Sequence, residues 1–309
     1  MLHAKSIFNE LTPPQQLILA VLLWIGCLGI ASVCSEYIQT SLQVHGVGMN
    51  VSSLKPRDIN ILRYTQILGT ILGFLLPSLL YGFLVTRRPV GYFFPIPAFD
   101  LKWLFFSIVL ILSIYPLIGL LAEVNNKVML PDIWEGLERE LRQLEALAKD
   151  YVVAFMDDKR VKIFVLNLIM IAVIPAICEE FFFRGVIQRI SYKIFGNFHI
   201  AILFSAFLFA FSHFEFYTFL PRLALGLLLG YMYYYTGSLI MPIFTHFLNN
   251  GTAVLSLYLS VLKGQPLKMD IENSVPILFV CVSTMFFIII YFYFVKSATM
   301  YRQQHTKNQ

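Results

Sequence analysis

Long apolar stretches alternate with short polar segments along almost the whole chain. Eight of these stretches approach the ~20 residues that a helix needs to cross a lipid bilayer. They lie at about residues 16–35, 65–85, 102–122, 161–182, 199–216, 219–235, 239–262 and 275–295. The pattern therefore predicts an all-α, polytopic integral membrane protein with about eight transmembrane helices.

One segment departs from this pattern. Residues 123–160 hold nine of the eighteen acidic residues, and apolar residues recur there at every third to fifth position between Asp132 and Asp158. This spacing predicts an amphipathic surface helix at about 131–158, outside the bilayer core. Such a helix rests on the membrane, covers the mouth of a cavity or binds a partner. We therefore expect three regions: a three-span region at 1–122, the amphipathic segment at 123–160 and a five-span region at 161–309.

Composition narrows the class of protein further. Of the 309 residues 58% are hydrophobic and only 13% are charged, whereas soluble domains have about 25% charged residues. The net charge of +5 is spread along the chain without a dense basic cluster, so no nucleic-acid partner is expected. The four cysteines lie in apolar stretches with no ligand-like spacing, and they indicate neither a disulfide framework nor a zinc site.

The fourth apolar stretch ends in charged residues that carry candidate chemistry. A charge near the centre of a membrane helix costs at least ~2.5–3.5 kcal/mol, so its presence suggests a function. Glu180 and Arg184 are four residues apart and can form an ion pair on one helix face. Glu179 points about 100° away from Glu180 and is left as a candidate general base. The structural alternative is that both glutamates mark the membrane interface at the end of a span.

Three further polar residues lie in later apolar stretches. His213 stands near the end of the fifth stretch, while His246 and Asn250 share one face of the seventh and Asn249 is turned away. Taken alone, a His/Asn pair could simply join two membrane helices by hydrogen bonds, and a lone His near a span end is often an interfacial residue.

Together these residues predict one site. Polar groups in lipid seek one another or a water-filled cavity, so Glu179, His213, His246 and Asn250 are expected to converge. A carboxylate and an imidazole would activate a water, and the second histidine and the amide would stabilise an oxyanion. A Glu/His/His set also suits a divalent metal, which stays open. Straight helices with these boundaries would, however, place Glu179 and His213 near opposite membrane faces.

Three motifs resemble the type II CAAX prenyl endopeptidase family, also called CPBP or Abi. They are Glu-Glu-x-x-x-Arg at 179–184, Phe-x-x-x-His at 209–213 and His-x-x-x-Asn at 246–250. The motifs stand in the family's order, and the resemblance covers about residues 160–260. It implies an intramembrane endopeptidase of the glutamate type. No cofactor is expected, except that a divalent metal stays open. The implied roles are water activation by Glu179 and His213, oxyanion stabilisation by His246 and Asn250, and support by Glu180 and Arg184.

The resemblance also implies the partners and the location. The expected substrate is a membrane-associated peptide or protein, with or without a prenyl group, and the expected location is the bacterial inner membrane. The main alternative is a non-enzymatic membrane scaffold or bacteriocin-immunity protein that keeps the same residues. A secondary transporter would also use carboxylates and histidines, but the polar residues here concentrate in one half of the chain.

Overall fold

The computed structural model describes Phe8, Val51 and residues 10–44, 54–86, 89–93, 101–267 and 275–306. Nearly all of these residues are helical and none of them forms a strand, so the prediction of an all-α protein is confirmed. The α-helices are α1 (Pro13–Ser41), α2 (Pro56–Thr70), α3 (Leu76–Val85), α4 (Pro89–Phe93), α5 (Lys102–Asn126), α6 (Glu135–Met156), α7 (Val161–Leu168), α8 (Ile174–Phe182), α9 (Arg189–Phe195), α10 (Phe198–Phe211), α11 (Phe219–Thr236), α12 (Ile240–Leu262) and α13 (Ile277–Thr306). Short π-helical stretches at Ile71–Leu75, Ile169–Val173 and Phe183–Gln188 join α2 to α3, α7 to α8 and α8 to α9.

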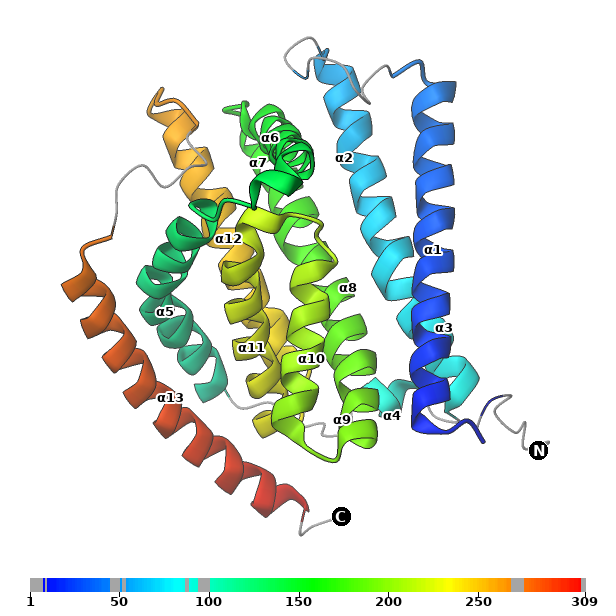
Figure 1. Cartoon of the computed structure of the whole chain (residues 1–309), viewed down its shortest axis with the longest axis vertical. Helices are drawn as coiled ribbons and strands as arrows, with labels where there is room; N and C mark the ends of the chain where they lie inside the picture. Colours follow the sequence, from blue (N-terminus) through cyan, green and yellow to red (C-terminus); the bar gives the residue numbers. More distant parts are fainter. Residues whose placement is uncertain are drawn as a thin grey trace.

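The long helices form a bundle with a centre and two flanks (Figure 1). Helices α8, α10, α11 and α12 make the centre, α1 to α3 pack along one side of it, and α5 and α13 lie along the other. The start of α1 and the end of α13 lie toward the same end of the bundle.

Five helical segments are long and apolar enough to cross a membrane. They are Pro13–Ser41, Pro56–Val85, Lys102–Asn126, Val161–Phe195 and Ile277–Tyr301. All eight predicted stretches lie on helices, but the count of eight spans is not confirmed. Helix α10 is only 14 residues long, and polar side chains interrupt the apolar character of α11 and α12.

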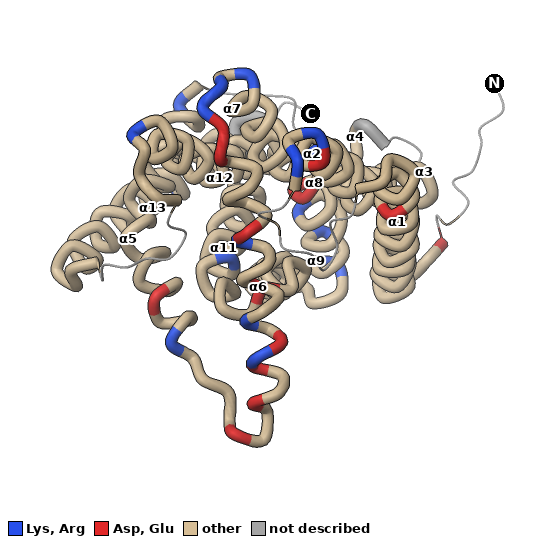
Figure 2. Tube along the Cα trace, turned by 90° about the horizontal axis from the view of Figure 1, so that it is seen from above, with Lys and Arg blue, Asp and Glu red and all other residues tan. Residues whose placement is uncertain are grey.

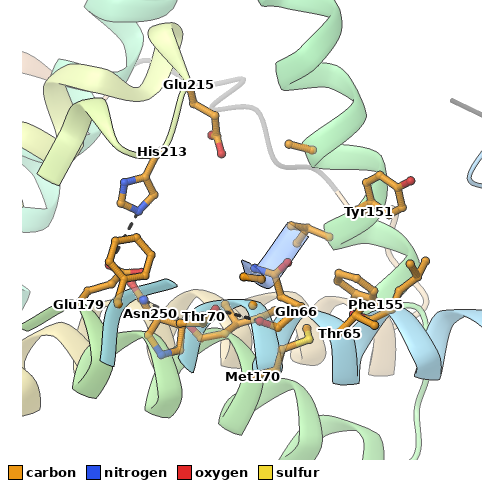
Figure 3. Close-up of a pocket in the computed structure, with 18 of the residues that line it drawn as sticks. Thr65, Gln66, Thr70, Tyr151, Phe155, Met170, Glu179, His213, Glu215 and Asn250 are labelled. Atoms are coloured by element: carbon orange, nitrogen blue, oxygen red, sulfur yellow. Dashed lines mark hydrogen bonds and ion pairs between the residues drawn. The ribbon is translucent and has the colours of Figure 1, made fainter. Parts of the chain in front are cut away.

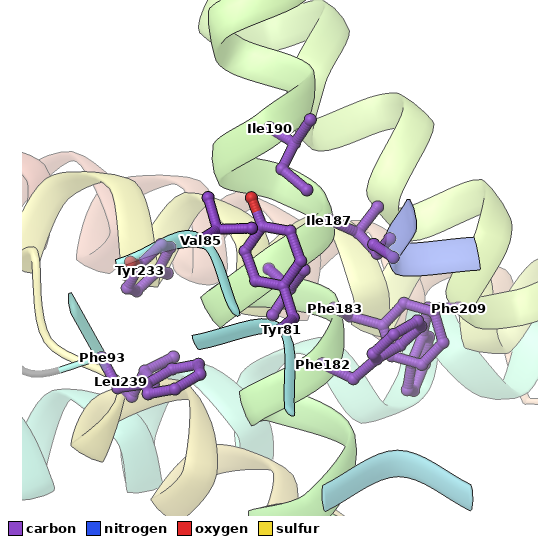
Figure 4. Close-up of a cluster of buried hydrophobic side chains, with 12 residues drawn as sticks. Tyr81, Val85, Phe93, Phe182, Phe183, Ile187, Ile190, Phe209, Tyr233 and Leu239 are labelled. Carbon is purple, nitrogen blue, oxygen red and sulfur yellow. The ribbon is translucent and has the colours of Figure 1, made fainter. Parts of the chain in front are cut away.

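The predicted end of the fourth span at residue 182 is wrong, because the continuous helix extends to Phe195. Of the charges at its predicted end, Glu180 and Arg184 form an ion pair buried inside the protein. Beyond them Phe183, Ile187 and Ile190 are fully buried in a cluster with Tyr81 and Phe209 (Figure 4). Packing against neighbouring helices thus carries the span three turns further than its hydropathy indicated.

A tight turn at Gly196 then determines which residues lie side by side. Gly196 has a φ of +63°, which glycine adopts without steric cost, and ends α9. Asn197 caps the start of α10 by accepting two backbone N–H groups. Glu179 lies seventeen residues before Gly196 and His213 seventeen residues after it. Because the two arms are antiparallel, these side chains reach the same height, which removes the conflict expected from the shorter span.

Helix α6 lies outside the bundle, as the amphipathic pattern predicted. Figure 2 shows the connection from α5 and the first turns of α6 projecting beyond the bundle with charges of both signs. The other end of α6 is anchored: Arg63 of α2 donates to the carbonyl of Phe155 (2.5 Å) and to Oδ1 of Asn167 (2.9 Å). This anchor holds the last turn of α6 against α2 and α7.

Two buried hydrogen bonds to backbone carbonyls join the π-helical stretch Phe183–Gln188 to α11. Gly226 and Gly230 form a small-residue pair on α11, the type of spacing that lets membrane helices approach closely. Arg184 donates to the carbonyl of Gly226 (2.8 Å) and Gln188 to that of Gly230 (3.0 Å). The two donors are four residues apart on one helix and the two acceptors are four residues apart on the other, so the two hydrogen bonds hold these helices in one register.

Candidate active site

A cavity of about 820 Å³ lies between the central helices, the α1–α2 pair and the end of α6. Its volume is in the upper range for small-ligand sites. Figure 3 shows Glu179 and His213 at one end, with Tyr151 and Phe155 of α6 at the other. The wall formed by α1 and α2 is polar, with Ser32, Ser35, Gln39, Thr65, Gln66 and Thr70 along it. Of the three roles open to the amphipathic helix, lining the mouth of this cavity is the one that the structure shows.

Glu179 and the two histidines meet at one end of this cavity. Oε2 of Glu179 lies 4.0 Å from Nε2 of His213 and 3.9 Å from Nε2 of His246. These separations are too long for direct hydrogen bonds and suit groups bridged by one water. Oε2 of Glu179 is buried and has no hydrogen-bond partner among the described residues. The geometry therefore leaves a carboxylate oxygen facing two imidazole nitrogens.

A backbone carbonyl determines which nitrogen of His213 carries the proton. Nδ1 of His213 lies 2.8 Å from the carbonyl oxygen of Phe209. A carbonyl can only accept, so Nδ1–H donates and Nε2 of the neutral ring keeps its lone pair. That lone pair is on the side of the ring that faces Glu179, where a base is useful.

The loop that carries His213 is held by helices from outside the central bundle. Asn125 of α5 donates to the carbonyl of Phe216 (3.0 Å). Glu145 of α6 accepts from the backbone N–H of Tyr217 (3.2 Å), and burial raises the pKa of this carboxyl. Both contacts lie within four residues of the histidine, so α5 and α6 fix the loop on which it stands.

The predicted ion pair between Glu180 and Arg184 is present and completely buried. Nη1 of Arg184 donates to Oε1 of Glu180 at 2.6 Å, and neither side chain is exposed. The same carboxylate oxygen lies 2.9 Å from Nδ1 of His246. Glu180 therefore accepts from His246 as well as from Arg184, and it fixes the orientation of an imidazole that faces Glu179. This contact to His246 was not part of the sequence-based expectation.

A proline on the helix that carries Glu179 explains the position of Asn250. Pro175 has no N–H, so the carbonyl of Ile171 four residues earlier loses its helical partner. Nδ2 of Asn250 donates to this carbonyl at 3.1 Å. Asn249, expected to point away, also lines the cavity and donates to Oδ1 of Asn250 at 3.0 Å. One N–H of the Asn250 side chain thus joins α12 to the helix that carries Glu179. The same amide group has a second N–H.

The four candidate residues line the same cavity. Residues 161–252 match the family model described as Type II CAAX prenyl endopeptidase Rce1-like. The segment resembles the Rce1-like family. This confirms the resemblance that the three motifs indicated. No curated protein and no solved structure matches the chain. The matched family is one of proteases that act on membrane-associated proteins, and the apolar helices are those of an integral membrane protein.

The Rce1-like segment supplies only one side of the cavity. The polar wall of α1 and α2 and the apolar residues of α6 come from outside residues 161–252. The sequence analysis assigned no role to the polar side chains of α1 and α2. Polar residues such as Gln66 within a long apolar segment could have indicated that this side of the helix faces a cavity. Glu215 also lines the cavity, together with Arg222 of α11.

Within the part of the chain that the structure describes, no group of three or more His, Cys, Asp or Glu side chains is arranged to hold a metal ion.

Proposed function

We propose that the protein is a glutamate-type intramembrane endopeptidase that hydrolyses a peptide bond in a membrane-associated protein. The proposal is carried by one observation: a buried, unpartnered carboxylate oxygen of Glu179 faces Nε2 of His213 across 4.0 Å. It is supported by the match of this segment to a protease family.

In the proposed reaction one water lies between Glu179 and His213. It donates one hydrogen to Oε2 of Glu179 and the other to Nε2 of His213, so its remaining lone pairs point into the cavity. As the water oxygen attacks the scissile carbonyl, Glu179 takes a proton, and that proton then passes to the leaving amine nitrogen as the C–N bond breaks. Two acceptors are needed because each fixes one hydrogen of the nucleophile.

The developing oxyanion would be stabilised from α12. An imidazolium at His246 donates Nδ1–H to Glu180 and presents Nε2–H to the reacting carbonyl oxygen. The second N–H of Asn250 is the other donor in this proposal. Oriented donors that exist before the reaction are worth about 10²–10³ in rate each. Arg184 pairs with Glu180 beside His246 and does not contact the substrate in this proposal.

We further propose that the chain spans the bacterial inner membrane eight times, with α10, α11 and α12 as the three additional spans. Arg222 of α11 and His246, Asn249 and Asn250 of α12 line the cavity, which would explain polar residues within two of these spans. We also propose that the substrate segment carries a prenyl group; the family resemblance alone supports this.

The test is Glu179→Gln in the full chain, reconstituted in liposomes with fluorogenic peptides anchored by a farnesyl group or left unmodified. We expect a loss of roughly 100-fold or more in kcat, because a general base contributes 10²–10⁴. Glu135→Gln, a carboxylate 72% exposed on α6, is the matched control. Full activity in Glu179→Gln would refute the mechanism, and an unchanged biological phenotype in an inactive variant would favour the scaffold alternative.

Removal of metal provides a second, independent test. Treatment with a strong chelator followed by dialysis is expected to leave the cleavage rate unchanged, because the proposed nucleophile is activated by side chains. A loss of activity that added zinc restores would overturn a mechanism without metal.

A further inference from the structure

The first half of α6 and the short 3₁₀ turn Asp132–Trp134 before it carry an apolar face that the described residues leave uncovered. The exposed apolar side chains of this face are Ile133, Trp134, Leu137 and Leu144. Ile133 is 86% exposed, and the buried side chains of α6 begin only at Glu145. Large apolar side chains gathered on one side of a helix indicate that another apolar surface covers them.

The direction of this face follows from the other end of the same helix. At 3.6 residues per turn, Leu137 and Leu144 lie on the same side of α6 as Tyr151 and Phe155. Tyr151 and Phe155 line the cavity, which α1 and α2 border on its other side. One continuous apolar face therefore lines the cavity at the end of α6 and lies uncovered at its start.

Helix α6 runs across the bundle rather than along it. It is seen nearly end-on in Figure 1, and Figure 2 shows its first turns projecting sideways from the bundle. It follows α5, which is long and apolar enough to cross a membrane. Val124 at the end of α5 and Met129 in the connection are exposed and lead to Ile133. The uncovered face is thus continuous with the exposed apolar surface of a candidate membrane span.

We propose that this face of α6 lies in the headgroup region of the lipid bilayer, with Trp134 as its anchor. Tryptophan favours this region because its ring is apolar while its N–H can donate a hydrogen bond to water or lipid. Arg139 and Gln143 lie on the opposite, polar side of α6, which stays in water. Residues 132–144 hold more acidic than basic residues, so burial of apolar surface holds the helix there, and anionic lipid is not required.

This inference goes beyond the proposed peptidase function and does not depend on it. A helix held at the membrane surface places Tyr151 and Phe155, and with them one end of the cavity, at the level of the lipid headgroups. That position is the same whether or not the protein cleaves a peptide.

The experiment measures the fluorescence of Trp134 in the full chain, reconstituted in phosphatidylcholine liposomes. The chain holds three tryptophans, so Trp24→Phe/Trp103→Phe leaves Trp134 as the only one. We expect blue-shifted emission that lipids brominated near the headgroup quench more strongly than lipids brominated near the chain ends, because an interfacial helix is buried by only ~5–10 Å. If this background fails to fold, the difference in quenching between the wild type and Trp134→Phe gives the same quantity.

Two matched variants separate the apolar face from the helix as a whole. Leu137→Ser/Leu144→Ser should shift the emission of Trp134 to the red and remove most of the quenching by brominated lipid. Arg139→Ser/Gln143→Ser introduces the same two serines on the polar side and should leave both signals unchanged.

Three results would overturn the proposal. Water-like emission that acrylamide quenches and brominated lipids do not would place Trp134 in water. Blue-shifted emission that brominated lipids leave unquenched would assign the cover to a second copy of the chain or to another protein. Equal quenching in the two serine variants would show that the apolar face does not hold the helix in lipid.

Discussion

Replacing Arg184 by methionine should destabilise the protein far more than the loss of two hydrogen bonds alone suggests. Arg184 donates to Glu180 at 2.6 Å and to the carbonyl of Gly226 at 2.8 Å, with neither charged side chain exposed. Methionine has a similar length and keeps the apolar contact that the guanidinium makes over the ring of Phe209. The substitution therefore removes mainly the charge and leaves the carboxylate of Glu180 buried without its cation.

The expected size of the effect follows from that unpaired carboxylate. Breaking a buried ion pair by removing one partner costs about 3–5 kcal/mol, whereas replacing both partners can be nearly neutral. In the double variant Glu180→Gln/Arg184→Met the amide oxygen still accepts from Nδ1 of His246. We therefore expect the second substitution to recover about 2–3 kcal/mol, a coupling typical of residues in direct contact.

Thermal unfolding in detergent measures this cycle. A loss of 3–5 kcal/mol corresponds to a fall in Tm of roughly 10 °C for a chain of this size. The exposed pair Glu135–Arg139, separated by 4.0 Å, is the matched control, and Arg139→Met should cost at most about 1 kcal/mol. The reasoning would be refuted if the Tm of Arg184→Met equalled that of the wild type, or if the Tm of the double variant were no higher than that of Arg184→Met.

Two further outcomes are expected. A Cβ on Gly230 would lie 2.8 Å from Ile202 and 3.0 Å from Gln188, so Gly230→Ala should lower Tm by an amount equivalent to about 1–3 kcal/mol, whereas Gly136→Ala, with open space around it, should not. The backbone N–H of Leu130 and the side chain of Arg142 lower the pKa of Glu138. This contact therefore stabilises the α5–α6 connection at pH values above the usual pKa of glutamate. The stabilisation is lost as the pH falls through the lowered pKa of Glu138. The protection factor of the Leu130 amide, which is its exchange relative to the intrinsic rate at the same pH, should therefore fall on acidification in the wild type, and it should lose this pH dependence in Glu138→Gln.

The part of the site that sequence could predict is the part encoded by local spacing. The ion pair of Glu180 and Arg184 follows from four-residue periodicity, and so does the common face of His246 and Asn250. The amphipathic spacing likewise predicted α6. These inferences need only one helix, whose geometry is fixed by its backbone hydrogen bonds.

What could not be predicted depends on contacts between helices. The fourth span was expected to end at its charges, because a hydropathy pattern cannot show that Glu180 is neutralised within the bundle. The bond from Asn250 to the carbonyl of Ile171 requires Pro175 and the placement of α12 beside it. The second wall of the cavity comes from α1 and α2, whose sequence matches no motif. Long-range packing decides each of these points.

The turn at Gly196 makes chain length itself a condition for activity. Glu179 and His213 face each other because equal numbers of residues separate them from the turn. Deleting one residue from either arm would rotate a side chain by about 100° and move it about 1.5 Å along its helix. Insertions and deletions should therefore be tolerated in the loops that join other helices, but not within this hairpin. The number of residues between Glu179 and His213 should therefore be constant among related chains, even where the side chains between them differ.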